Sequence, residues 1–197
     1  ARQYMIDLIE MLQPKKVVVN YGNHDLRFQN YLAKNLDTDL LELMPKTSLE
    51  LIFVDGFNHY NKELHTKVHY DPLMDVFKDS GIEIVYNDTW FSFVGETIFV
   101  HPLAYSSGML KTAEKAYRYF KDNDYFFDTI VMAHTHKTGH YDIGNSVIYE
   151  QGCCCETSKM DYADGKLTPS QREGFILVYQ DKFGRLNEDK THIVRLN

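Results

Sequence analysis

The feature that most constrains this chain is a short apolar run that ends in a turn of chemically versatile polar residues. Residues 17–19 are Val-Val-Val, and residues 22–25 are Gly-Asn-His-Asp. A short apolar run bounded by turn residues is typical of a buried strand. The turn offers an amide oxygen for a cation, an imidazole that can act as acid or cation, and a carboxylate that can fix the imidazole tautomer. This pattern predicts a functional site where a strand ends.

Two later segments repeat the pattern. Residues 130–132 are Ile-Val-Met and are followed by Ala-His-Thr-His at 133–136, while residues 99–102 are Phe-Val-His-Pro. If the chain stays extended, His134 and His136 point to the same side. Strands that each end in metal-ligating residue types predict one shared site at the edge of a sheet.

Composition favours a single globular domain over residues 1–197. The chain is 44% hydrophobic, and a chain of this size can bury about 70% of its unfolded surface. The net charge of −7 argues against attraction of the whole surface to nucleic acid. It does not exclude a phosphorylated substrate, because bound cations reverse the local field.

Cysteine usage and hydropathy favour a cytoplasmic protein that does not enter the membrane. The three cysteines are consecutive, at 153–155, which does not resemble a secreted disulfide framework. No segment approaches the roughly 20 apolar residues of a membrane span. The chain begins at Ala1 within a helical pattern, so we expect the natural N-terminus to lie upstream.

Periodicity and turn residues predict helices that interleave with strands early in the chain and strands that dominate later. This order is typical of a layered α/β domain. We expect helices at 3–12, 26–44 and 109–122, with shorter helical pieces around 48–55 and 71–79 joined by a polar connection. We expect strands at 16–20, 82–86, 90–94, 97–100, 128–133, 138–142, 146–151, 174–180 and 191–196, and a polar loop at 156–173.

The three polar clusters together resemble the signatures of the calcineurin-like metallophosphoesterases. Gly-Asn-His-Asp at 22–25 resembles the third signature, and Ala-His-Thr-His at 133–136 resembles the last one, Gly-His-x-His, with Ala in place of Gly. His101 resembles the lone metal-binding histidine between them, and residues 101–108 are most similar to phage and bacterial members. The resemblance implies a two-layer β sandwich flanked by helices, with the site at the strand ends.

The resemblance also implies a role for each residue. The implied metal ligands are Asn23, His101 and His134 for one divalent cation and His136 for the other. His24 would donate to the leaving-group oxygen or stabilise the transition state, and Asp25 would orient it. The implied reaction is in-line attack of a metal-bound hydroxide on phosphorus. Manganese is the first candidate cation, with iron, zinc, nickel and magnesium as alternatives, and phosphodiesters, including nucleotides or nucleic acid, are favoured as substrates.

The sequence departs from the family in one respect. The family opens with Asp-x-His and Gly-Asp-x-x-Asp, and this sequence contains neither Asp-x-His nor a Gly-Asp pair. We expect that the first strands of the domain are missing. Two alternatives stay open: a non-catalytic binding or scaffolding module, and a single structural metal site. The natural coding sequence upstream of Ala1 discriminates between them and the enzyme.

Several other residues have a functional and a structural interpretation. Arg27 can contact phosphate in a bidentate manner or be an ordinary surface residue, and His140 can contact phosphate or belong to a hairpin. The consecutive cysteines are better explained as buried small side chains than as a zinc site, because neighbours on an extended strand point to opposite faces. The aromatic segment 117–127 can stack bases or, more simply, pack the core.

Overall fold

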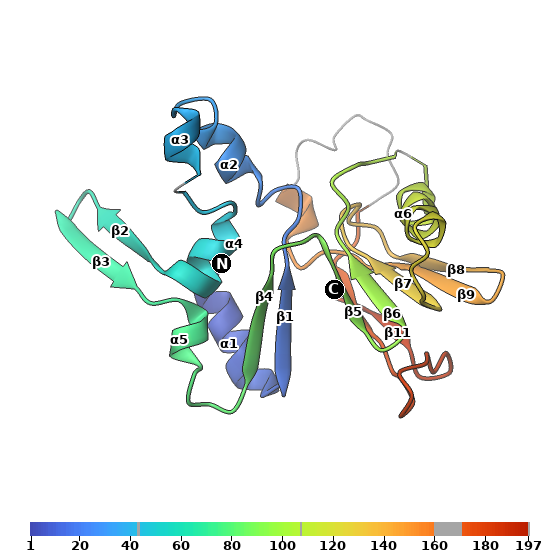
Figure 1. Ribbon diagram of the computed structural model, residues 1–197. Coiled ribbons are helices and arrows are strands. Elements are labelled where there is room, and N and C mark those ends of the chain that lie inside the picture. The colour runs from blue at the N-terminus through green and yellow to red at the C-terminus, as the bar shows by residue number, and fades with distance from the viewer. Residues whose placement is uncertain (43, 107, 160–170, 197) are drawn as a thin grey trace. The chain divides into compact units, whose positions relative to one another are not determined.

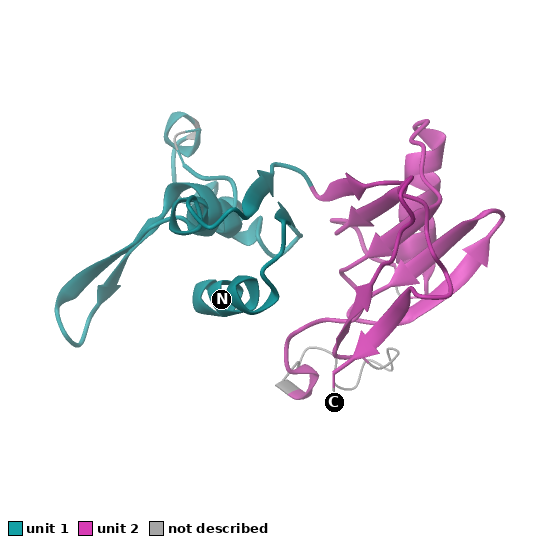
Figure 2. Cartoon of the chain, turned by 90° about the horizontal axis from the view of Figure 1, so that it is seen from below, with its two compact units in different colours: residues 1–89 teal, residues 90–197 magenta. Residues whose placement is uncertain are grey.

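The computed structural model describes residues 1–42, 44–106, 108–159 and 171–196, and it shows a mixed α/β fold. The chain divides into two compact units, residues 1–89 and 90–197, which Figure 2 distinguishes by colour. The predicted α/β class is confirmed. Most of the predicted polar loop at 156–173 lies outside the described residues.

Unit 1 is built around two parallel strands. Its elements in chain order are α1 (Arg2–Leu12), β1 (Lys16–Asn20), α2 (Arg27–Leu32), α3 (Thr38–Leu41), α4 (Ser48–Glu50), the π-helix η1 (Leu51–Asp55), β2 (Phe57–Asn61), β3 (Thr66–Tyr70), α5 (Leu73–Val76) and β4 (Glu83–Asn87). Strands β1 and β4 are paired in parallel from Lys16 opposite Glu83 to Asn20 opposite Asn87. The predicted strand at 16–20 is therefore confirmed in its full extent.

The core of unit 1 joins this strand pair to the helices around it. Ile9 of α1, Phe53 of η1 and Leu73 of α5 are buried, and alternate residues of the strands, such as Val17 and Ile84, pack against them. This alternation follows from the two-residue repeat of a strand, which turns every second side chain to one face. The core thereby fixes where β1 ends and the Gly-Asn-His-Asp turn begins.

Two predictions for unit 1 are wrong. The connection between the helical pieces at 48–55 and 71–79 is a β-hairpin, β2–β3 (Figure 1). Its register places Phe57 opposite Tyr70. Most of its side chains are exposed, so the apolar alternation that reveals a half-buried strand is absent. The helix predicted over 26–44 is broken into α2 and α3, where the Asn35 side chain donates to the Tyr31 carbonyl at 2.7 Å in place of a continued helix.

Unit 2 contains a five-stranded mixed sheet. Its strands are β5 (Phe91–Val94), β6 (Thr97–Val100), β7 (Thr129–Met132), β8 (Gly139–Ile143) and β9 (Ser146–Glu150), in the order β5-β6-β7-β9-β8. The three central strands are parallel, and the two edge strands are antiparallel to their neighbours. The register aligns Val100, Met132 and Glu150, so the carboxyl ends of the central strands lie at one edge of the sheet.

Each face of this sheet is covered by a different layer. Helix α6 (Lys111–Asp122) packs on one face through Ala113, Ala116 and Phe120 (Figure 1). The antiparallel pair β10 (Gly174–Leu177) and β11 (His192–Arg195) covers the other face, with Ile176 and Ile193 against the sheet. The chain also has a short 3-10 helix, η2, from Thr157 to Lys159. Two sheet layers with a helix outside agree with the fold that the family resemblance implies.

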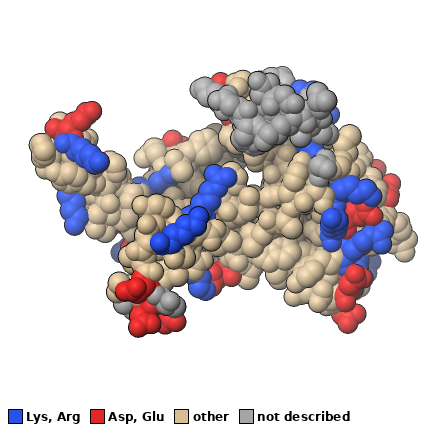
Figure 3. Space-filling view, turned by 90° about the horizontal axis from the view of Figure 1, so that it is seen from above, with Lys and Arg blue, Asp and Glu red and all other residues tan. Residues whose placement is uncertain are grey.

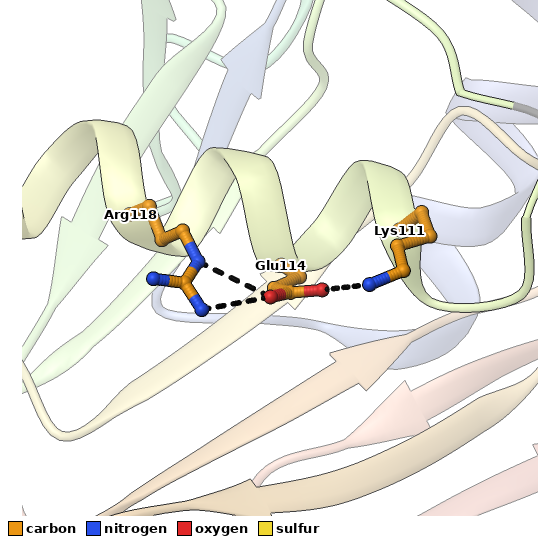
Figure 4. A network of polar contacts seen from close by, with 3 residues as sticks. All are labelled: Lys111, Glu114 and Arg118. Carbon is orange, nitrogen blue, oxygen red and sulfur yellow. Dashed lines mark hydrogen bonds and ion pairs between the residues drawn. The ribbon is translucent and has the colours of Figure 1, made fainter.

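The outer surface of α6 carries a network of charged side chains (Figure 4). The Lys111 ammonium donates to the Glu114 carboxylate at 2.8 Å, and the Arg118 guanidinium donates to it at 2.9 and 3.1 Å. Two hydrogen bonds lower the pKa of Glu114, and the one from Lys111 contributes more than the one from Arg118. Pairs three and four positions apart lie on one helix face, which leaves the apolar face of α6 for the sheet.

The surface mixes both charge signs with uncharged areas. Side chains of both signs occur on the face shown in Figure 3, separated by broad uncharged areas. Within the residues that the structure describes, none of the helices has both the length and the apolar character needed to cross a bilayer.

Candidate functional site

The parallel register of β6 and β7 brings two of the predicted histidines together in unit 2. The Ala133 N–H donates to the Val100 carbonyl at 3.0 Å, which continues the ladder one residue past each strand. His101 and His134 directly follow these positions. Their rings lie edge to face, with 5.4 Å between the centroids.

The backbone at this edge is held on both sides of the histidine pair. The His101 N–H donates to the Trp90 carbonyl at 2.8 Å, next to β5. The Tyr105 ring lies 6.0 Å from the His134 ring, so the chain after β6 folds back over the pair. The pair is therefore built by strand pairing and by the returning loop.

The segment that carries His134 and His136 is not extended, so the condition under which both side chains would point to one side is not met. Strand β7 ends at Met132, and the φ angles of His134 and His136 are 129° and 58°. Positive φ is unfavourable for residues with a Cβ and costs about 1–3 kcal/mol, so the surroundings must hold it. The Arg172 N–H donates to the His136 carbonyl at 2.7 Å and supplies part of that support.

A buried Lys–Glu pair lies beside this strained segment and was not predicted. Lys137 and Glu150 are both buried, although Glu150 ends strand β9 at the same sheet edge. Burial raises the pKa of Glu150, while the Lys137 charge, the Thr135 side chain and the Leu110 N–H lower it in part. The only sequence signal was a carboxylate at the end of an otherwise apolar strand.

In unit 1, Asp25 stabilises the turn that presents His24. One of its carboxylate oxygens accepts from the Gly22 N–H at 2.8 Å, and the other accepts from the Ser48 hydroxyl at 3.3 Å. These bonds tie the turn to the start of α4. Asp25 thus stabilises the backbone of the turn that contains His24.

His24 itself is exposed and lies next to Arg27. The guanidinium Nη2 is 3.4 Å from the His24 Nε2. A guanidinium can only donate, so a hydrogen bond at this contact requires the His24 Nε2 to be the acceptor. Arg27 is also exposed.

The ends of β1 and β4 add two amide side chains that the sequence did not single out. The Asn87 Nδ2 donates to the Asn20 Oδ1 at 3.1 Å, across the last pair of the strand register. The Tyr21 N–H then donates to the Thr89 carbonyl. This pairing fixes the chain immediately before the turn that contains Asn23.

His140 lies on strand β8, opposite Tyr149 of β9. It is exposed on β8, and its ring stacks on Tyr149 with 5.6 Å between the centroids. Tyr149 belongs to the sheet face that β10 and β11 cover. His140 lines a cavity with Asp142, Glu188 and His192, so its predicted contact with substrate phosphate gains no support.

The donor set fits a divalent cation in chemistry but is incomplete within unit 2. Imidazoles are suitable ligands for zinc, iron and nickel, and His101 and His134 supply two adjacent ones. Among the described residues, however, no three His, Cys, Asp or Glu side chains come close enough to hold a metal ion. Asn23, the third predicted ligand of this cation, belongs to unit 1.

The cysteines differ from the sequence-based interpretation as buried small side chains. Cys154 and Cys155 are exposed, and Cys153 is only partly buried. An isolated bridge pairs Cys153 with Glu173, and among the described residues no named strand includes the three cysteines. All three are free thiols.

Comparison with known proteins gives only weak similarities. No family model matches the chain, and no curated protein matches it significantly. A single mutant of Vps29 from Entamoeba histolytica is 15% identical, with a TM-score of 0.34, over 59% of this chain and 69% of that one. A conserved uncharacterized protein of Streptococcus pneumoniae, described as a predicted phosphoesterase, is 10% identical, with a TM-score of 0.27, over 92% and 97% of the two chains. Scores this low carry no argument about the function of this chain.

Proposed function

We propose that this chain is a metal-dependent phosphoester hydrolase, acting on phosphodiesters in preference to monoesters. The observation that carries the proposal is the edge-to-face pair of His101 and His134 at the carboxyl ends of two parallel strands. Strained backbone next to such a pair is characteristic of functional sites, because folding alone does not favour it.

In this proposal His101, His134 and Asn23 hold one divalent cation, manganese first, and His136 contributes to a second. When bound, such cations supply Lewis-acid activation of water and neutralise charge that develops on the phosphoryl group. His24 donates a proton to the leaving-group oxygen, Asp25 holds the His24 turn, and Arg27 contacts the phosphoryl oxygens. The three free thiols favour a reducing compartment, the cytoplasm.

The test is hydrolysis of bis-p-nitrophenyl phosphate with Mn²⁺ by the natural polypeptide, including any residues that precede Ala1. We expect His134→Gln to abolish both hydrolysis and high-affinity Mn²⁺ binding. His192→Gln is the matched control, because His192 is an exposed histidine of unit 2 whose ring bonds to its own chain at Lys190. Equal loss in both variants would contradict the assignment.

A second function, a non-catalytic binding or scaffolding module, is favoured by one observation. The described residues lack a group of three His, Cys, Asp or Glu ligands. This alternative predicts that the natural polypeptide neither binds Mn²⁺ nor hydrolyses any phosphoester, and that His134→Gln leaves its properties unchanged. Calorimetric titration with Mn²⁺ separates the two functions before any substrate is known.

A further inference from the structure

A cavity of about 350 Å³ opens in unit 2 directly after His101. The side chains that shape it are Trp90, Pro102, Leu103, Tyr105, Lys115 and Tyr119. They come from the start of β5, from the loop that follows β6 and from α6. The volume lies within the range of small-molecule sites, which is about 300–1,000 Å³.

Aromatic rings form much of the wall, and two of them are far more exposed than packing requires. Trp90 and Tyr119 lie with 5.8 Å between their centroids, and Trp90 also contacts the buried Phe120 at 5.2 Å. Tyr105 and Tyr119 are each 52% exposed. Exposed ring faces that border a cavity offer stacking surfaces to a flat ligand.

The loop that forms one wall is fastened to the helix that forms the other. The Ser106 N–H donates to the Thr112 hydroxyl at 3.0 Å, and that hydroxyl lies 3.2 Å from the Ser106 carbonyl, to which it donates. Thr112 is buried at the start of α6. The cavity is therefore largely formed before any ligand enters.

The cavity shares a wall with the histidine pair. Tyr105 lines the cavity, and its ring lies 6.0 Å from the ring of His134. Pro102, at the cavity wall, directly follows His101. A phosphoester held at His101 and His134 would thus have a substituent within reach of this cavity.

The charges of the lining favour a ligand that carries phosphate. Lys115 is exposed on α6 at the cavity, and no carboxylate is among its lining residues in the described part of the chain. The cavity can therefore receive an anionic molecule with a planar aromatic end without repelling it.

We propose that this cavity binds the nucleobase of a nucleotide phosphoester whose phosphoryl group lies at His101 and His134. The proposal rests on the proposed hydrolase function for the position of the phosphoryl group. The base stacks on the exposed ring of Tyr119, and Trp90, whose ring is tilted by 52° to that of Tyr119, forms the adjoining wall. Lys115 adds a positive charge at the cavity, which suits an anionic ligand. An aliphatic substituent would leave the ring faces without a stacking partner.

The single tryptophan of the chain, Trp90, reports on occupancy of the cavity directly. Trp90 fluorescence, excited at the red edge of the indole band where bases do not absorb, is titrated with AMP and separately with ribose 5-phosphate. We expect AMP to quench Trp90 and to bind at least tenfold more tightly than ribose 5-phosphate. Equal affinities for the two ligands would overturn the proposal.

Variants of Tyr119 test whether stacking of the base on this ring causes AMP to bind more tightly than ribose 5-phosphate. Base–aromatic stacking contributes about 1–3 kcal/mol, so Tyr119→Ala should weaken AMP binding by about fivefold or more, whereas Tyr119→Phe should retain it. The control is Phe126→Ala, because Phe126 is 79% exposed and does not line the cavity. An unchanged AMP affinity in Tyr119→Ala would contradict the assignment, and retention by Tyr119→Phe excludes simple misfolding.

Failure of the two proposals is distinguishable. AMP quenching that depends on Tyr119, in a protein that hydrolyses no phosphoester, supports the base site and refutes the hydrolase. Hydrolysis that depends on His134, with no preference for AMP over ribose 5-phosphate, supports the hydrolase and refutes the base site.

Discussion

The imidazole of His134 lies edge-on to the imidazole of His101, with 5.4 Å between the ring centroids. Parallel pairing of β6 with β7 creates this contact, because Val100 and Met132 are in register and the chain continues past both. The positive φ of His134 then turns the ring toward its neighbour in place of continuing the strand. Two rings so placed can share one cation.

The first prediction concerns this pair. His101→Gln and His134→Gln should each weaken Mn²⁺ binding by at least about tenfold, because each removes one imidazole donor from a small ligand set. Isothermal titration calorimetry of the natural polypeptide measures the change. His192→Gln should bind Mn²⁺ as the unmodified protein does. A His101 variant with undiminished affinity would show that the ring contact is only structural.

The second prediction separates catalysis from metal binding. His24→Ala should slow hydrolysis of bis-p-nitrophenyl phosphate by about 10²–10⁴-fold, the usual contribution of a general acid, while Mn²⁺ affinity stays nearly unchanged. His24 is exposed and bonds only weakly to Arg27, so its removal should leave the fold intact. A variant that keeps its full rate, or that loses the metal, would reverse the roles of His24 and Asn23.

Sequence reasoning succeeded where local pattern and tertiary structure agree. Strands such as 97–100 and helix 111–122 carry a clear apolar repeat, and each ends at a recognisable turn. The adjacency of His101 and His134 also followed, because the carboxyl ends of neighbouring parallel strands share an edge.

The sequence did not predict those parts of the structure that leave no pattern in the residues around them. The β2–β3 hairpin is exposed on both faces, so its side chains carry no alternation. The backbone turns at 134–136 through positive φ angles at His134 and His136, and the residue types there do not predict those angles. The burial of Lys137 and Glu150 was not predicted, because charged residues are usually exposed.

The third prediction concerns stability of unit 2. Phe120 is fully buried and contacts the rings of Trp90, Phe91 and Tyr125 at 5.0–5.3 Å between centroids. Phe120→Ala should lower the free energy of unfolding by about 3–5 kcal/mol, through lost burial and the cavity left behind. Urea denaturation measures it. Phe126→Ala, at an exposed site, should change it by less than about 0.5 kcal/mol.

The fourth prediction concerns thiol reactivity and its pH dependence. Burial, more than any other cause, raises the pKa of Cys153 to about 11, so the folded protein holds it as a thiol at neutral pH. Only the thiolate is alkylated rapidly, so carboxymethylation of Cys153 should accelerate as pH rises toward 11. Peptide mass spectrometry at a series of pH values follows each cysteine separately.

The raised pKa of Cys153 also makes the free energy of unfolding depend on pH. An unfolded thiol ionises near pH 8.5, so the folded state binds more protons than the unfolded state between about pH 8.5 and 11. Stability from this group is therefore complete below that window and is lost as pH rises through it. Rapid alkylation of Cys153 at pH 7 in the folded protein would contradict the raised pKa.

The final prediction counts ligands in the 197-residue chain itself. Asn23, His101 and His134 would supply three donors to one cation, and none of the three is anionic. His136 alone cannot hold a second ion, and among the described residues no further His, Cys, Asp or Glu side chains complete a group of three. Without a bridging carboxylate, two dications repel each other and the pKa of the water between them is lowered less.

This chain should therefore bind at most one Mn²⁺ or Zn²⁺ ion weakly and catalyse poorly. Calorimetric titration with each metal gives the stoichiometry and affinity, and His134→Gln should remove the binding that is seen. Binding that survives in His134→Gln would place the ion elsewhere. Two tight sites per chain would mean that other residues supply metal ligands, with His59, His65, His69 and Asp71 as the first candidates, and that the ligand set of Asn23, His101 and His134 is wrong.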